Sequence, residues 1–246
     1  MQWYQGPEGD QRIWYEPDEI ERIAEDELRR ASLMPSLSEP VTDLERFIES
    51  HLHAELDQYA ELPDDVLGLT QFQAGRRPVV SINSKLTESA EADTANPGAV
   101  GRWRATMAHE ASHILLHRYL FDPEMAQLVG AQVGSNAPGE RAGLMRCLYR
   151  DVVPVSTQDA SQTRRRRDWR EIQANRGMAA LLMPDRPFKR LAFQQMANVG
   201  LVTVSTGTAA ADTLMAEMAE IFNVSKQAAM IRLETLQICT PGSGEK

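Results

Sequence analysis

The sequence has few cysteines: Cys147 and Cys239 are the only two in 246 residues, and they lie far apart along the chain. Such a pair forms neither a disulfide framework nor a Cys-x-x-Cys metal clip, because both need clustered cysteines. A chain of this length can bury a substantial core without covalent cross-links. We therefore expect a protein suited to a reducing compartment, with one large domain or one large and one small domain.

Long apolar runs and a basic start are also missing. No stretch approaches the roughly 18 apolar residues of a membrane-spanning helix. The first residues, MQWYQGPE, lack the positive charge and the apolar run of a signal peptide. We predict a soluble, cytoplasmic protein with no membrane partner.

Positive charge is scarce relative to negative charge. The chain has 26 Lys and Arg against 35 Asp and Glu, which gives a formal net charge of -9. Tight binding of nucleic acid needs a surplus of Lys and Arg on one face to neutralise phosphates. The run Arg164 to Arg167 is a local exception, but charge runs that open helices are usually solvated faces. We expect no tight nucleic-acid binding.

Apolar periodicity predicts a mostly helical α+β fold. Two extended segments, 66–72 and 78–83, predict a small antiparallel sheet. Helical spacing of apolar residues occurs over 16–31, from 41 toward Pro63, and over 103–120, 164–183, 213–222 and 225–237. The last two helices, joined by Asn223 and Val224, have the outline of a helix-turn-helix.

One short motif in the third of these helices indicates a chemistry. His109-Glu110-Ala111-Ser112-His113 matches H-E-x-x-H in a segment without a helix breaker. At about 3.6 residues per turn, the two histidines share a face and both reach one ion, while Glu110 points about 100° away. We interpret His109 and His113 as zinc ligands, and Glu110 as the group that takes a proton from the metal-bound water. The alternative is a helix with two surface histidines.

The other three histidines lack ligand spacing. His117 follows His109 by about 12 Å along a helix, which is too far for both to bind one ion. We expect His117 to make no metal contact and to lie beside the site or on the surface. His51 and His53 stand among acidic residues, and we expect both to be solvated.

Three blocks of the sequence resemble the ImmA/IrrE family of zinc metallopeptidases. They are 104–117, which contains the motif and a trailing Leu-Leu-His, 171–184, which reads E-x-x-A-N followed by L-L-M-P, and 222–236, which is similar to the family's C-terminal helices. The resemblance implies a zincin-like metallopeptidase domain over 1–187 and a C-terminal, helix-turn-helix-like helical region over 188–246.

The resemblance also implies the third zinc ligand. In the family this ligand is the glutamate of the second block, and the matching residue is Glu171. A catalytic zinc takes three protein ligands and keeps an open position, and His2Glu is one known set. The alternative is a surface glutamate at the start of a buried helix, where acidic residues are favoured by the helix dipole.

Two departures from the family affect this assignment. Between His113 and Glu171 lie 57 residues, more than in the family's usual connection, so we expect an insertion over 121–163. Three acids of that region could replace Glu171 as the ligand: Asp122, Glu124 and Glu140. Gly177 stands where the family more often has an aromatic residue, so the second helix is expected to be either loose or closely packed there.

The implied activity is that of an endopeptidase. The resemblance implies cleavage of a helix-turn-helix transcriptional repressor, encoded nearby, that releases a stress response or a mobile element. The residues themselves support zinc-assisted hydrolysis of an amide, with Glu110 as general base and then general acid.

A non-catalytic regulator is the alternative function. It would bind a repressor or DNA and keep a structural zinc site, and the C-terminal helical outline with Lys226 and Arg232 supports it. Against DNA binding, residues 223–236 have few basic side chains, and Glu217, Glu220 and Glu234 would repel phosphates. We therefore interpret the C-terminal helices as a contact module for a partner protein.

Overall fold

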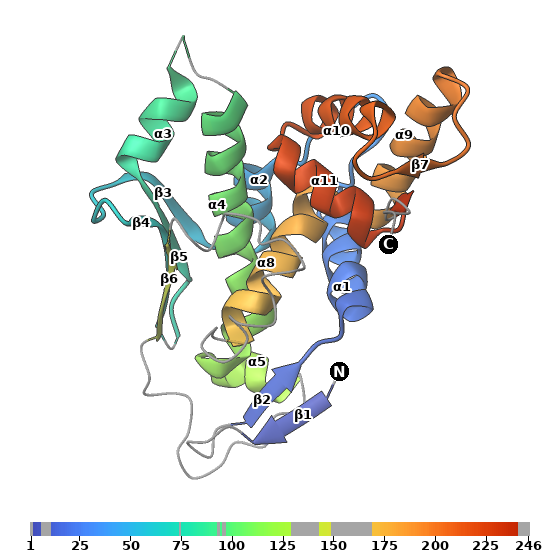
Figure 1. The fold of residues 1–246 in the computed structure, drawn as a ribbon. Helices are drawn as coiled ribbons and strands as arrows, with labels where there is room; N and C mark the ends of the chain where they lie inside the picture. Colours follow the sequence, from blue (N-terminus) through green and yellow to red (C-terminus); the bar gives the residue numbers. More distant parts are fainter. Residues whose placement is uncertain are drawn as a thin grey trace.

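A computed structural model of the chain describes residues 2–5, 11–73, 75–92, 94, 97–128, 143–148 and 169–240. The described part is mostly helical with a small sheet, as the sequence predicts for an α+β protein. Two long helices, α4 (Pro97–His117) and α8 (Trp169–Leu182), pass through the middle of the molecule, with the sheet on one side and the C-terminal helices on the other (Figure 1). Among the described residues, no helix combines the length and apolarity needed to cross a membrane.

The remaining helical segments surround this pair. They are α1 (Pro17–Arg30), α2 (Leu44–Arg46), the π-helical turn η1 (Phe47–His51), α3 (Ser84–Glu91), the 3-10 turn η2 (Arg118–Leu120), α5 (Pro123–Leu128), α9 (Asp185–Asn198), α10 (Ala209–Phe222) and α11 (Lys226–Thr235). The strands are β1 (Gln2–Gln5), β2 (Gln11–Trp14), β3 (Glu55–Ala60), β4 (Val66–Phe72), β5 (Val79–Asn83), β6 (Gly143–Leu148), β7 (Val204–Ser205) and β8 (Cys239–Thr240).

Helix ends follow local capping chemistry. Helix α1 begins with a capping box between Glu16 and Glu19 and has a proline in its first turn. Thr208 caps α10 and Ser225 caps α11 through their side-chain oxygens. Asn223 ends α10 in the left-handed region with a φ of 51°, which an asparagine tolerates. The two C-terminal helices and their short connection are present as predicted, although α10 begins four residues before residue 213 and α11 ends two residues before residue 237.

The two predicted strands, β4 and β5, pair antiparallel as predicted, but the sheet as a whole is mixed because a third strand, β3, is parallel to its neighbour. The order of the sheet is β3-β5-β4-β6, and β4 is antiparallel to both of its neighbours. Strand β3 is parallel to β5. Strand β6 comes from the stretch predicted as an insertion, so that stretch supplies an edge of the sheet.

The helix predicted from residue 41 toward Pro63 is wrong beyond residue 51. Strand β3 takes its place, and its residues alternate between exposed and half-buried with the period of two that a strand requires. Leu56 fits the helical stripe but pairs with Val80 of β5. Pairing with β5 determines that this segment is a strand, as often happens when a short apolar pattern fits both a helix and a strand.

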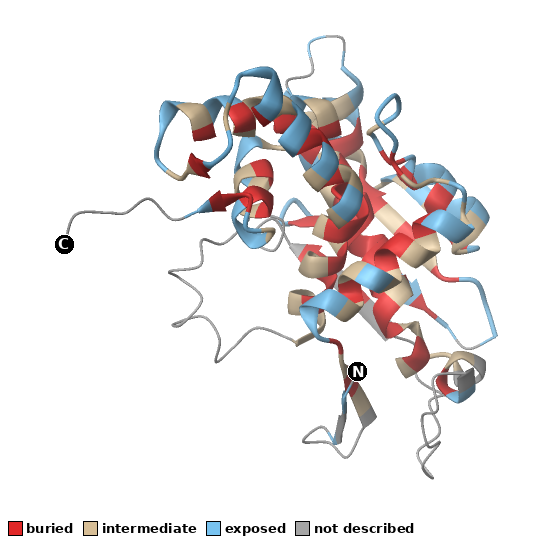
Figure 2. Ribbon diagram, turned by 90° about the vertical axis from the view of Figure 1, so that its right-hand side faces the viewer, coloured by how far each residue is buried: buried red, intermediate tan, exposed pale blue. Residues whose placement is uncertain are grey.

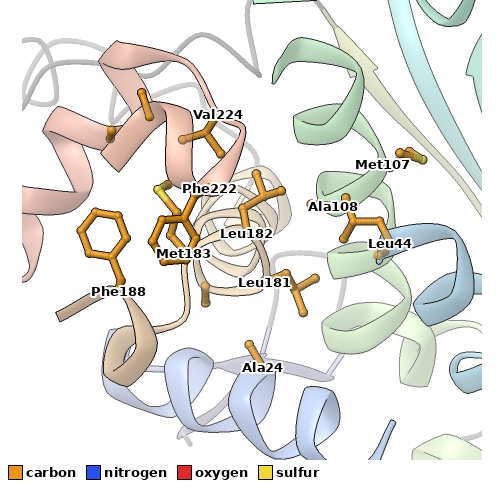
Figure 3. Close-up of a cluster of buried hydrophobic side chains, with 14 of the residues drawn as sticks. Ala24, Leu44, Met107, Ala108, Leu181, Leu182, Met183, Phe188, Phe222 and Val224 are labelled. Atoms are coloured by element: carbon orange, nitrogen blue, oxygen red, sulfur yellow. The ribbon is translucent and has the colours of Figure 1, made fainter. Parts of the chain in front are cut away.

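The core extends from α1 to the C-terminal strand β8. Figure 2 shows the buried residues concentrated in the interior, with exposed residues on the outer turns. Leu182, Phe188 and Phe222 belong to the same buried cluster, and the rings of Phe188 and Phe222 lie 5.1 Å apart (Figure 3). Apolar packing thus continues across residue 187, where the sequence predicts a domain boundary, and the division itself stays a prediction.

Candidate metal centre

Helix α4 is buried on all sides where it carries the motif. Every residue from Thr106 to Ile114 is buried, because the sheet covers one side of the helix and α8 covers another (Figure 1). His109, Glu110 and His113 are each 0% exposed. Buried ionisable groups need specific partners, so the contacts of these three side chains indicate what the site can do.

The two motif histidines and Glu171 converge. His109 Nε2 lies 3.0 Å from His113 Nε2 and 3.1 Å from Glu171 Oε2, and His113 Nε2 lies 3.5 Å from Glu171 Oε1. Two atoms bound to one tetrahedral zinc at about 2.0–2.1 Å lie roughly 3.3–3.4 Å apart. The separations therefore fit a tetrahedral ion.

The donor set also fits zinc chemically. Two imidazole nitrogens and a carboxylate oxygen are ligands that zinc takes in catalytic sites, with one position left open. The side chain of Glu171 is 19% exposed, whereas both histidines are fully buried. Water therefore reaches the three candidate ligands from the side of Glu171. Within the described ranges, no other set of three His, Cys, Asp or Glu side chains is close enough to hold an ion.

Burial keeps His113 in its metal-binding form. The pKa of His113 lies well below its ordinary value, because burial disfavours the charged ring and His109, His117 and Arg170 add unfavourable positive charge nearby. The neutral imidazole keeps a lone pair for a metal.

Glu110 points toward the sheet. Thr70 Oγ1, on β4, donates a hydrogen bond to Glu110 Oε2 and lies 3.3 Å from the Glu110 main-chain oxygen. Gly68, two residues earlier on the same face of β4, leaves room for the carboxylate, since a Cβ there would lie 2.8 Å from Glu110 Oε1. Neither residue could be predicted from the sequence, because a threonine and a glycine in a strand form no motif of their own.

The surroundings raise the pKa of Glu110 to about 7. Burial is the largest cause, and the charge of Glu171 acts in the same direction. His109, the hydroxyl of Thr70 and the main-chain amide of Cys147 oppose the increase. A carboxyl group with a pKa near the working pH is suited to accept and then donate a proton.

His117 and His51 are not members of the group of three candidate ligands, His109, His113 and Glu171. His117 is fully buried behind His113, where it contacts Gln173 and the edge of the Trp169 ring. His51 is only 20% exposed at its side chain and is bound to Glu27, so the expectation that it is solvated is wrong. The packing of helix α1 against the η1 turn could not be read from the acidic composition around it.

Of the three alternative ligands, only Asp122 has a side chain in the described part of the chain, and it does not belong to the group of candidate ligands. Asp122 pairs with Arg118, with Nε and Oδ2 3.0 Å apart. The side chains of Glu124 and Glu140 lie outside the described part of the chain, as does the run from Arg164 to Arg167.

In its C-terminal half, the chain matches the model of a peptidase family. Residues 156–234 match the family model described as the IrrE N-terminal-like domain. The matched stretch contains Glu171, helices α8 to α10 and all but the last residue of α11, and it follows the H-E-x-x-H helix in the sequence. A search of curated proteins and a search of solved structures each give no significant match. The match to this peptidase family confirms that the chain resembles the ImmA/IrrE metallopeptidases.

Proposed function

We propose that the chain is a zinc-dependent endopeptidase. One observation carries the proposal: three side chains that suit zinc converge at ion-sized separations, and the buried carboxyl group of Glu110 lies beside two of them on the same helix. The metallopeptidase family match supports it independently. In this proposal His109, His113 and Glu171 hold the metal, and Glu110 is the catalytic residue.

A bound zinc ion would polarise the scissile carbonyl and lower the pKa of a water in its open position to about 7. Glu110 takes one proton from the attacking water, whose oxygen bonds to the carbonyl carbon. The hydrogen bond from Thr70 fixes the carboxyl group during this transfer. As the carbon–nitrogen bond breaks, Glu110 passes the proton to the leaving amine, and burial favours the neutral acid between the two transfers.

The resemblance supports a protein substrate of one kind. We propose a helix-turn-helix transcriptional repressor encoded near this chain, whose cleavage releases a stress response or a mobile element. A cytoplasmic location suits this partner, and two buried cysteines that form no disulfide with each other suit a reducing compartment. We further propose that residues 1–187 form the catalytic domain and that helices α10 and α11 contact the partner.

The test is cleavage of that repressor by matched variants. Glu110→Gln keeps the shape of the side chain but cannot accept a proton at neutral pH. Cleavage should fall by at least about 100-fold, the low end of what a positioned acid–base group contributes. Glu88→Gln removes the same charge from an exposed position on α3 and should leave cleavage unchanged.

Zinc content is measured for each protein before the assay. Equal cleavage by wild type and Glu110→Gln would remove Glu110 from the mechanism. Absence of cleavage by either zinc-loaded protein, with equal binding of the repressor, would favour the non-catalytic regulator.

A further inference from the structure

A chain of buried hydrogen bonds runs from the proposed ligand His113 to the main chain of β2. His113 Nδ1 lies 3.1 Å from His117 Nδ1, and His117 Nε2 lies 3.1 Å from Gln173 Oε1. At the far end, Gln173 Nε2 donates to the carbonyl oxygen of Ile13 at 3.1 Å. All four residues are 0% exposed.

The carbonyl of Ile13 determines which atom donates in each of these hydrogen bonds. A carbonyl oxygen only accepts, so the amide nitrogen of Gln173 must face Ile13 and its oxygen must face His117. The Gln173 oxygen also only accepts, so His117 must carry its proton on Nε2. A His117 ring that carries its one proton on Nε2 offers a lone pair at Nδ1.

The last step places the proton on His113. Since His117 Nδ1 accepts, the proton of His113 must be on Nδ1, and its Nε2 keeps the lone pair. That Nε2 is the atom that lies 3.0 Å from His109 and 3.5 Å from Glu171. The opposite tautomer of His113 would direct an N–H at the position of the ion.

The anchor at Ile13 is itself held on both sides. Its main-chain N–H donates to the hydroxyl oxygen of Tyr119 at 2.8 Å, just beyond the end of α4. Its side chain lies in a small buried cluster with Tyr15, Ile20, Leu116 and Tyr119. Strand β2 thus presents a carbonyl that packing against α1, α4 and η2 keeps in place.

We propose that Gln173 is a positioning residue for the metal centre: acting through His117, it sets the tautomer of His113 that leaves Nε2 free to bind the ion. The same helix would then supply a ligand, Glu171, and two residues later the group that orients another ligand. The role of Gln173 in metal binding rests on the proposed function. The tautomers themselves follow from the hydrogen bonds of the metal-free chain.

The first test reads those tautomers directly. Long-range proton–nitrogen correlation spectra of metal-free protein with ¹⁵N-labelled histidine distinguish an Nδ1–H from an Nε2–H ring. Single variants of the five histidines give the assignments. We expect Nε2–H for His117 and Nδ1–H for His113. An Nδ1–H ring at His117 would overturn the proposal, and this readout needs no change at Gln173.

The second test measures zinc affinity by competition with a chelator. Gln173→Met keeps the length of the side chain and removes both hydrogen bonds, so affinity should fall by about 10- to 100-fold, as for other partners of metal-bound histidines. In the spectra of this variant, His117 should become a mixture of tautomers. Met196→Ala, a buried change on α9, controls for lost stability and should leave the affinity unchanged.

The outcomes separate this proposal from the proposed function. Unchanged zinc affinity in Gln173→Met, or an equal loss in Met196→Ala, would reduce Gln173 to a packing role and overturn the proposal. A wild-type chain that shows the expected tautomers but cleaves no repressor would refute the peptidase and leave the role of Gln173 in place. A wild-type chain that binds no zinc would refute both.

Discussion

Gly177 of α8 lies directly against Ser112 of α4. A Cβ atom at position 177 would be 2.6 Å from Ser112 Oγ and 2.8 Å from Ser112 Cβ, closer than atoms can pack. Ser112 is between the two proposed histidine ligands in the sequence, and Glu171 begins the part of α8 that faces them. Of the two expectations for Gly177, loose or closely packed, the structure supports close packing, and this contact lets α8 bring Glu171 to the histidines.

Gly177→Ala should therefore destabilise the protein, although alanine is the better helix former. The change gains up to about 1 kcal/mol in helix propensity, against a cost of roughly 1–3 kcal/mol for overpacking. We expect a net loss of about 1–2 kcal/mol in the free energy of unfolding, and weaker zinc binding because the helices separate. Denaturant unfolding and chelator competition measure the two effects.

A second substitution tests whether the loss comes from Ser112. Ser112→Gly removes the atoms that the new methyl group would meet, so in the double variant the two changes should be less costly than the sum of the single ones. Strict additivity of the free energies would mean that the helices do not touch there.

Replacing Glu171 tests the proposed ligand set. Glu171→Ala should lower zinc affinity by at least about 100-fold, the upper end of what changes outside the coordination shell cost. Asp122→Ala is the matched control, since Asp122 pairs with Arg118, and it should bind zinc as wild type does. If Glu171→Ala instead retains full affinity, the third ligand comes from another acid, and Glu124→Ala and Glu140→Ala become the next variants to measure.

Much of the candidate site could be predicted because local spacing determines it. His109, Glu110 and His113 share one helix, and the geometry of a helix follows from the sequence. Glu171 is 62 residues from His109, and only the resemblance indicated it. Thr70, Gln173 and Ile13 were missed, because a hydrogen bond between distant buried groups leaves no pattern in a single sequence.

The fold shows the same division between local and distant interactions. The capped and strongly periodic helix α1 begins and ends as predicted. Strand β3 and strand β6 were missed, since each depends on pairing with a strand from elsewhere in the chain. Arg232, which the sequence offers as a phosphate-binding group, is 3% exposed and is bound to Glu21 and to the carbonyl of Met183.

The position of Arg232 leads to a prediction about DNA. A buried guanidinium that already pairs with a carboxylate cannot contact phosphates, so α11 presents even less positive charge than its sequence indicates. We expect no sub-micromolar binding of duplex DNA at physiological salt in a gel-shift titration. Tight binding that weakens steeply with added salt would contradict this and would favour the regulator.

The raised pKa of Glu110 predicts how the stability of the metal-free protein depends on pH. A carboxyl group whose pKa rises from 4.5 to about 7 on folding is neutral in both states at low pH and opposes folding once it must ionise. Its contribution is therefore most favourable below about pH 4.5 and is lost as the pH rises through about 7. At about 1.4 kcal/mol per pKa unit, a rise of about 2.5 units limits the loss to roughly 3–4 kcal/mol.

Glu110→Gln should remove this dependence, because its amide oxygen can still accept the hydrogen bond from Thr70 but the side chain does not ionise. Urea unfolding in the presence of a chelator, at about pH 5 and about pH 8, gives the free energy of unfolding of each protein. We expect the free energy of unfolding of the variant, relative to that of wild type, to increase by about 2–3 kcal/mol from about pH 5 to about pH 8. The exposed Glu88→Gln should follow wild type. A constant cost of burying the amide cancels, because only the change between the two pH values is compared. If the free energies of unfolding of Glu110→Gln and wild type change equally with pH, Glu110 titrates normally and is not tuned for proton transfer at neutral pH.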